Sequence, residues 1–151
     1  MANSKRKTVV EYIRDTTLAR IQTANGFNTN VGTRSRGLLE IDAVNESEFP
    51  AVFISRVTED IDNITRNQVK VTLHVFLVCY VKNSTGLDAL QADMDDFIED
   101  VTEAIEYDRT LGGNAHWIEL KTVLTDYGNL SPHGQFVVLF DVKLATEGTT
   151  Q

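Results

Sequence analysis

The clearest pattern in the chain is an alternation of side chains between Val69 and Val81. Every second residue of VKVTLHVFLVCYV is apolar, and the intervening positions include Phe76, Val78 and Tyr80. A period of two is typical of a β-strand, and apolar residues on both faces favour a central strand. The pattern fits equally a strand that meets a partner subunit.

Two segments show helical spacing instead. Between Leu87 and Asp108, apolar residues recur three and four positions apart and fall on one face, which predicts a long amphipathic helix. A first helix is predicted after Ser4, a suitable N-cap, and Asn25-Gly26 should end it. Its apolar stripe consists of Val10, Ile13, Thr17 and Ile21.

The remaining segments predict strands and connections. Phe27 to Gly32 should be extended, a weak apolar segment covers Leu38 to Val44, and Pro50 opens a strand with the sequence PAVFISR. Val57 to Gln68 is mostly polar and matches neither period, so a long protruding loop or hairpin arm is expected. Two more strands, His116 to Thr125 and Gln135 to Ala145, are joined by the loop DYGNLSPHG.

This order of elements lacks the βαβ alternation of parallel sheets. We therefore expect an α+β fold with a mostly antiparallel β-sheet and two helices packed on one face. Residues 1–151 should form a single domain, with a basic N-terminal arm at 1–7 and a flexible C-terminal end at 146–151.

Charge and composition disfavour several classes of protein. The net charge of -8 disfavours broad binding to DNA or to an anionic membrane. The longest apolar run is much shorter than the roughly 20 residues that a membrane span needs. No signal peptide pattern follows the N-terminus, so synthesis and retention in the cytoplasm are expected. The single cysteine, Cys79, is expected to be a buried free thiol.

The predicted long helix is strongly acidic. Leu87 to Asp108 holds nine carboxylates and no Lys or Arg, so like charges four residues apart oppose the helix. Three interpretations remain open for its acidic face: a solvated surface, an electrostatic surface for a partner or against DNA, or a metal site in ADMDD. The face itself is formed by Asp95, Asp96, Glu99 and Glu103.

Patterns of catalytic chemistry are absent from the sequence. His74, His116 and His133 lie in separate segments, and no P-loop, nucleophile elbow or zinc spacing occurs. Gly112-Gly113 follows a helix and precedes a strand, the reverse of a phosphate-binding loop, so a tight turn is expected. We therefore expect no catalytic residue, cofactor or metal.

The order of these segments resembles the tail-terminator (minor tail protein U-like) proteins of long-tailed bacteriophages. The resemblance covers most of the chain and includes "ANGF", "FPAVFIS" and "YDRTLGGNAH". Its sharpest part is the motif D-x-T-L-G-G, which consists of Asp108, Thr110, Leu111, Gly112 and Gly113.

The resemblance implies a late structural protein of the virion tail that is not an enzyme. Such a protein would form a homo-oligomeric, hexameric ring that caps the tail tube, ends tube polymerisation and joins the tail to the head. Its partners would be the tail tube protein and the head-tail connector protein, and DNA would pass through without specific binding. A head-completion or neck connector protein, and a small metal-dependent enzyme using the Asp-rich helix, remain the alternatives.

Partner contacts are expected on charged segments outside the core. The polar segment Val57 to Gln68 is expected either to contact a neighbouring ring, because loops held on a rigid sheet commonly carry binding, or to be an ordinary disordered loop. Basic residues could also fasten one subunit to the acidic helix of the next. The acidic face could instead line the lumen. The candidate interface residues are Arg34, Arg36, Glu59, Asp60, Asp62 and Arg66.

Overall fold

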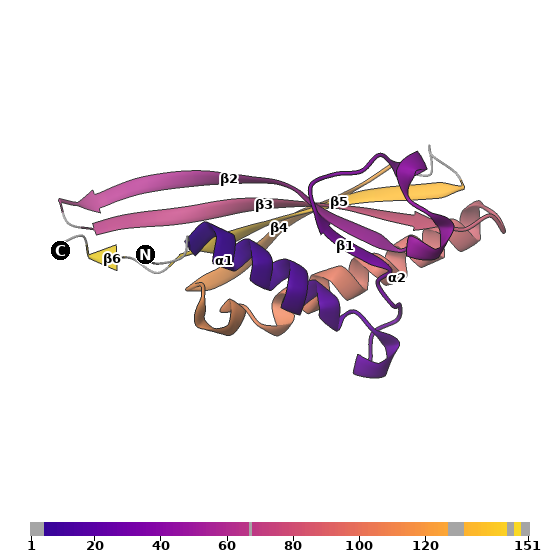
Figure 1. Cartoon of the computed structure of the whole chain (residues 1–151), viewed down its shortest axis with the longest axis horizontal. Coiled ribbons are helices and arrows are strands. Elements are labelled where there is room, and N and C mark those ends of the chain that lie inside the picture. Colours follow the sequence, from indigo (N-terminus) through magenta and orange to yellow (C-terminus); the bar gives the residue numbers. More distant parts are fainter. Residues whose placement is uncertain (1–4, 67, 127–131, 145–146, 149–151) are drawn as a thin grey trace.

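The computed structural model describes residues 5–66, 68–126, 132–144 and 147–148, and it has an α+β fold with a mixed, mostly antiparallel sheet (Figure 1). Strand order is β1-β2-β3-β5-β4, with β6 also pairing with β3; β1 and β2 are parallel, and the other pairs are antiparallel. The predicted fold class is confirmed. The elements are α1 (Lys5–Tyr12), β1 (Thr33–Arg36), β2 (Ala51–Thr65), β3 (Gln68–Lys82), α2 (Leu87–Tyr107), β4 (Trp117–Thr125), β5 (His133–Lys143) and β6 (Glu147–Gly148).

Strand β3 lies at the centre of the sheet and carries the core. It hydrogen-bonds to β2 on one edge and to β5 on the other. Its alternating residues Leu73, Val75, Leu77 and Cys79 are fully buried. They form one apolar cluster with residues of both α1 and α2, so the two helices cover the same face, as predicted. Cys79 is a buried free thiol, also as predicted.

A second, smaller core explains the apolar residues on the other face of β3. Val78 and Tyr80 pack there with Ala51 and Phe53 of β2 and with Val44 from the connection between β1 and β2. This connection is irregular and contains 3-10 turns at Ile41–Ala43 and Glu46–Glu48. At this end of β3, the chain itself covers the strand's second apolar face.

Several boundaries differ from the sequence predictions. Strand β1 forms in the polar stretch Thr33–Arg36, because it is an edge strand whose backbone pairs with β2 while Arg34 and Arg36 stay exposed. Lys5 to Lys7, predicted as part of the basic arm, form the first turn of α1. Glu147–Gly148, predicted within the flexible end, forms β6. Ser4, residues 1–3 and the other residues of the C-terminal end lie outside the described residues.

The first helix is less regular than its apolar stripe suggests. α1 ends at Tyr12 and continues as a π turn at Ile13–Thr17 and a 3-10 turn at Leu18–Arg20. β-branched Thr16 and Thr17 restrict the helical rotamers at this point. The predicted stripe is nevertheless fully buried, so packing holds the segment in place despite its irregular backbone.

One carboxylate of the acidic helix is buried in the fold. Asp100 has no exposed surface and accepts hydrogen bonds from the backbone N–H groups of Asn28 and Thr29, at 3.0 and 2.8 Å, and from the Thr29 hydroxyl. A buried charge is tolerated when donors surround it in this way. Asp100 therefore fastens the extended segment before β1 to α2, and it does not belong to the solvent-facing acidic surface.

The polar segment between β2 and β3 is a paired hairpin, which confirms the hairpin arm over the loop. The register runs from Val57 opposite Val75 to Asn63 opposite Val69. We call residues 57–66 and 68–72 the hairpin arm. Figure 1 shows the arm extending at one end of the molecule, past both helices. Within the described residues, no helix is long and apolar enough to cross a membrane.

Candidate interaction surfaces

The hairpin arm carries four of the predicted interface residues, but two of them hold the arm to the body. Glu59 accepts a hydrogen bond from Arg6 of α1 at 3.1 Å, and Arg6 also donates to the backbone carbonyl of Val57. Asp60 lies 2.7 Å from the Nε2 atom of His74. Asp62 and Arg66 are exposed nearer the tip. Asp62 and Arg66 therefore remain the candidates of this set for contact with a partner.

Apolar side chains accompany these charges on the arm. Ile61 is 60% exposed and Ile64 is 50% exposed. A two-stranded ribbon is only marginally stable by itself, and exposed apolar groups on it favour a protein partner. The sequence analysis emphasised the polar residues of the arm and missed these two isoleucines.

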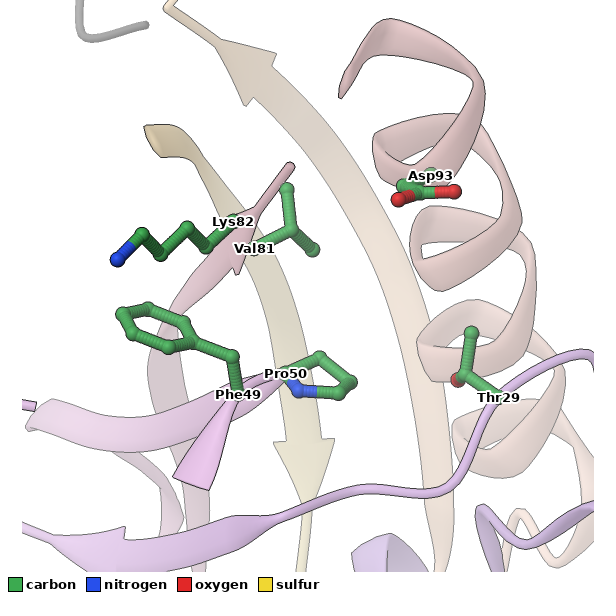
Figure 2. A pocket seen from close by; sticks show the side chains of 6 residues that line it. All are labelled: Thr29, Phe49, Pro50, Val81, Lys82 and Asp93. Carbon is green, nitrogen blue, oxygen red and sulfur yellow. The ribbon is translucent and has the colours of Figure 1, made fainter. Parts of the chain in front are cut away.

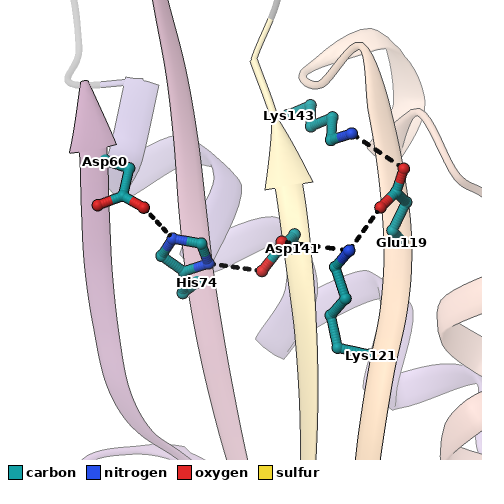
Figure 3. A network of polar contacts seen from close by, with 6 residues as sticks. All are labelled: Asp60, His74, Glu119, Lys121, Asp141 and Lys143. Carbon is teal, nitrogen blue, oxygen red and sulfur yellow. Dashed lines mark hydrogen bonds and ion pairs between the residues drawn. The ribbon is translucent and has the colours of Figure 1, made fainter. Parts of the chain in front are cut away.

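A chain of charged groups crosses the sheet at the base of the arm, on the face opposite the helices (Figure 3). His74 of β3 lies between Asp60 of β2 and Asp141 of β5, with nitrogen–oxygen distances of 2.7 and 2.6 Å. From Asp141 the chain continues to Lys121, 3.8 Å away, and then to Glu119, 2.8 Å further on. Lys143 closes it, 2.9 Å from Glu119.

Hydrogen bonds within this chain shift the pKa values of His74 and Glu119. The hydrogen bond to Asp60, followed by that to Asp141, raises the pKa of His74 despite partial burial. A carboxylate only accepts, so both His74 contacts are satisfied when both ring nitrogens carry a proton. Hydrogen bonds from Lys121 and Lys143 lower the pKa of Glu119 to about 2. In the sequence, His74 lies within the alternating pattern of the strand, and only the pairing register places it between two carboxylates.

The predicted basic and acidic partners lie on different elements of the subunit. Arg34 and Arg36 are on β1, an edge strand beside β2, and the Arg34 Nε atom donates to the carbonyl of Arg14 at 3.0 Å. Helix α2 instead contacts β3, β5 and β4, towards the opposite edge. Its residues Asp95, Asp96, Glu99 and Glu103 are all exposed. Glu99 also accepts a hydrogen bond from the Asn28 amide at 3.5 Å, so the acidic face borders the segment that leads into β1.

The D-x-T-L-G-G motif is a tight turn, as expected, and Asp108 organises it. Its carboxylate accepts hydrogen bonds from the Thr110 hydroxyl, from the N–H groups of Thr110 and Gly112, and from the Tyr12 hydroxyl, at 2.8 to 3.2 Å. Burial tends to raise the pKa of Asp108, but these hydrogen bonds outweigh it and lower the pKa. The motif thus joins the end of α2 to the end of α1.

Backbone geometry explains the glycines of this turn. The φ angles of Leu111, Gly112 and Gly113 are +49°, +65° and +92°. Leu111 accepts this rare conformation while fully buried in the core. A Cβ atom at Gly112 would lie 2.9 Å from the Tyr12 ring, whereas a Cβ atom at Gly113 would meet nothing within 4 Å.

No group of three or more His, Cys, Asp or Glu side chains that could hold a metal ion occurs in the part of the chain that the structure describes. Within the ADMDD segment, Asp93 accepts a hydrogen bond from the Asn83 amide at 2.7 Å, while Asp95 and Asp96 are exposed. The structure thus gives the metal interpretation of the acidic helix no support.

The chain matches the family described as Bacteriophage Tail Tube Terminator Protein over residues 3–150, which is almost its full length. No curated protein matches the chain.

The two glycines of the turn provide a matched test of its geometry. Gly113→Ala should lower the free energy of unfolding by about 1–2 kcal/mol, the usual cost of a side chain in a left-handed conformation. Gly112→Ala should cost a further roughly 1–3 kcal/mol, because the new methyl group overlaps Tyr12. Urea unfolding measures both. Equal losses in the two variants would show that contact with Tyr12 does not constrain the turn.

The raised pKa of His74 predicts a pH-dependent contribution to stability. The contribution is complete below the unfolded pKa of about 6.5 and is lost as the pH rises through the higher folded pKa. His74→Gln should therefore destabilise the protein more at pH 6 than at pH 9, by an amount of about 1 kcal/mol or less because the pair is partly exposed. Urea unfolding at both pH values measures the difference.

His116→Gln is the control for this comparison. A loss in His74→Gln that does not change between pH 6 and pH 9 would argue against a charged His74 between Asp60 and Asp141.

Proposed function

Since the chain belongs to the bacteriophage tail tube terminator family, we propose that it caps the tail tube, ends tube polymerisation and provides the surface that joins tail to head. Membership makes it a structural component of the phage tail, and the match over residues 3–150 is the observation that carries the proposal. The function needs no catalysis. Synthesis in the host cytoplasm would precede assembly into the virion.

The proposed assembly is a hexameric ring built from one repeated contact. The basic edge at β1, with Arg34 and Arg36, would meet the acidic face of α2 on the next subunit. The two surfaces have opposite charge and lie on different elements, one on an edge strand and one on a helix. Such a contact is heterologous, and heterologous contacts close into rings when the rotation between subunits allows it.

The proposed contact with the tail tube is the hairpin arm. It extends past the helices, and its exposed tip combines Asp62 and Arg66 with Ile61 and Ile64. Mixed apolar and charged groups are typical of protein interfaces. DNA would pass through the ring without specific binding, because a chain of net charge -8 repels phosphate.

The contact between subunits is tested by reversing one charge on the exposed edge. Arg36→Glu should lower the fraction of capped tubes at least about tenfold, because like charges facing each other across an interface cost several kcal/mol. Asp96→Arg in the same chain should restore much of the capping. Negative-stain microscopy of tubes mixed with each purified variant gives the count.

Arg66→Glu makes the same change of charge on the arm and serves as the control. Crosslinking in solution measures ring closure, which Arg66→Glu should leave unchanged. If Arg36→Glu caps tubes as well as the wild type, β1 does not carry the subunit contact.

The tube contact is tested by shortening the arm. Asp60 and Thr72 face each other across the hairpin, so an Asn-Gly turn can join them and remove residues 61–71 while keeping the Asp60–His74 contact. This variant should fold, as judged by circular dichroism and urea unfolding, but should leave tubes uncapped and abnormally long. Wild-type protein should form a ring at one tube end.

Two outcomes would contradict these assignments. Tubes of normal length with the shortened arm would show that another surface contacts the tube. Wild-type protein that never forms a ring, with or without tubes, would contradict the proposed function itself.

A further inference from the structure

The sheet ends on both sides in strands whose outer edges are open. Within the part of the chain that the structure describes, β1 pairs only with β2, and β4 pairs only with β5. Proteins usually protect such an edge with charges, proline or a bulge. The register of β4 shifts between Leu120 and Thr122, and residues 122–125 after this irregularity carry no charge. The second half of β4 is therefore an unprotected edge.

The backbone of residues 122–125 offers hydrogen-bond donors to a further strand. The Asp126 N–H donates to the carbonyl of Gln135 on β5 at 3.2 Å. N–H groups alternate between the two sides of a strand, so those of Val123 and Thr125 point away from β5. This edge can therefore add a strand by ordinary backbone pairing.

One row of the strand register crosses the whole sheet and joins its two edges. The row consists of Ser35, Phe53, Val78, Val137 and Leu124. Ser35 on β1 and Leu124 on β4 thus lie at the same level. β1 is parallel to β2, and each of the following pairs towards β4 is antiparallel, so β1 and β4 run in opposite directions. When two copies lie side by side at one level, β4 of one meets β1 of the next as an antiparallel pair.

The basic side chains of β1 fit this arrangement on the helical face. Arg36 lies opposite Ile54, a residue of the main core, so it points to the face that the helices cover. Arg34, opposite Val52 of the same core, has the same orientation. In the next copy, helix α2 contacts β4 on that face and exposes its carboxylates. Pairing of the strands therefore brings opposite charges together.

The other face brings apolar side chains together. Leu38 and Leu39 follow β1 and are 52% and 48% exposed. The Tyr80 hydroxyl donates to the Leu39 carbonyl at 2.8 Å, which holds this segment on the face opposite the helices. Leu124 is 57% exposed and lies on the same face, because it is opposite Val137, which packs against the second core. Between adjacent copies, the leucine pair after β1 covers the exposed leucine of β4.

The connection that carries this leucine pair is already held on the sheet. A pocket of about 190 Å³ lies at the end of β3 opposite the arm, and Figure 2 shows Lys82 extending there on the side of Phe49. Its ammonium group pairs at 3.2 Å with Glu46 of the connection between β1 and β2. With Tyr80 and Lys82 both contacting the connection, little ordering is needed when it binds a partner.

We propose that residues 122–125 of β4 pair as an antiparallel strand with β1 of a second copy of this chain, and that Leu38 and Leu39 of that copy pack on Leu124. The inference rests on the proposed ring and adds backbone pairing and an apolar part to its repeated contact. Because the two edges of one sheet differ, the contact is heterologous, and the sheet continues from subunit to subunit around the ring.

Cysteines at the two ends of the register row test the pairing directly. Ser35→Cys with Leu124→Cys places two thiols on one face of neighbouring strands, where Cα atoms lie within the roughly 4.4–6.8 Å that a disulfide allows. Oxidation of this variant, alone and on tail tubes, should give a ladder of linked subunits on a non-reducing gel. The native Cys79 is fully buried and does not take part. Ser35→Cys with Leu87→Cys is the control, because Leu87 is 48% exposed at the start of α2, and it should give no ladder.

Leu124→Glu tests the apolar part of the contact. The fraction of subunits in rings should fall at least about tenfold, because the new carboxylate would be buried against Leu38 and Leu39 of the next copy. Leu87→Glu makes the same change on a similarly exposed leucine and should close rings as the wild type does. Crosslinking in solution measures ring closure, and urea unfolding shows that each variant is folded.

Two results would overturn the inference. If the Ser35→Cys, Leu124→Cys variant stays unlinked while the wild type forms rings, β1 and β4 do not pair at this level. Rings of Leu124→Glu in the wild-type amount would exclude the apolar contact. Both results leave the proposed function intact, whereas wild-type protein that forms no ring, with or without tubes, contradicts that function and removes this inference with it.

Discussion

The burial of one face of β3 is the constraint on which the rest of the structure depends. Leu73, Val75, Leu77 and Cys79 are fully enclosed between the sheet and the two helices, and the strand is hydrogen-bonded along both edges. A shift of one residue in register would turn these side chains to the opposite face, so the pairing is strongly specified. The strand has 15 residues, and its N-terminal end extends past the helices as part of the hairpin arm. The same strand thus separates the arm from the pocket.

The charges of the molecule are arranged around this core. Helix α2 forms although its carboxylates repel one another, because its apolar stripe is buried and Asp100 accepts hydrogen bonds from the segment before β1. On the other face of the sheet, His74 links the arm to the central strands through two carboxylates. The base of the arm therefore contacts the body through His74 on the outer face and through Arg6 on the helical face.

Periodic elements were predictable from the sequence, and elements held by long-range contacts were not. The alternation in β3 and the stripe of α2 gave both elements close to their observed bounds, because local spacing reports directly which face is buried. Strand β1 is polar and short, and its strand geometry comes from pairing with β2, which no local pattern shows. Asp100 could have been noticed, since it lies between Phe97 and Val101 on the buried face of the helix. The pocket required three segments far apart in the sequence to come together.

The family motif and the proposed contact residues differ in what they do. The motif stabilises the subunit, and the contact residues are exposed on its surface. Asp108 and Gly112 keep the corner between α2 and β4 in one conformation, with their hydrogen bonds and close contacts directed inward to the turn itself and to Tyr12. Asp62 and Arg36 are exposed and can change with little effect on folding. The motif therefore stabilises the fold that the family shares. It carries no information about which tube or head a given terminator binds. We expect that specificity from the exposed residues of the arm and of the basic edge, where an altered side chain would change a contact between proteins and leave the core intact.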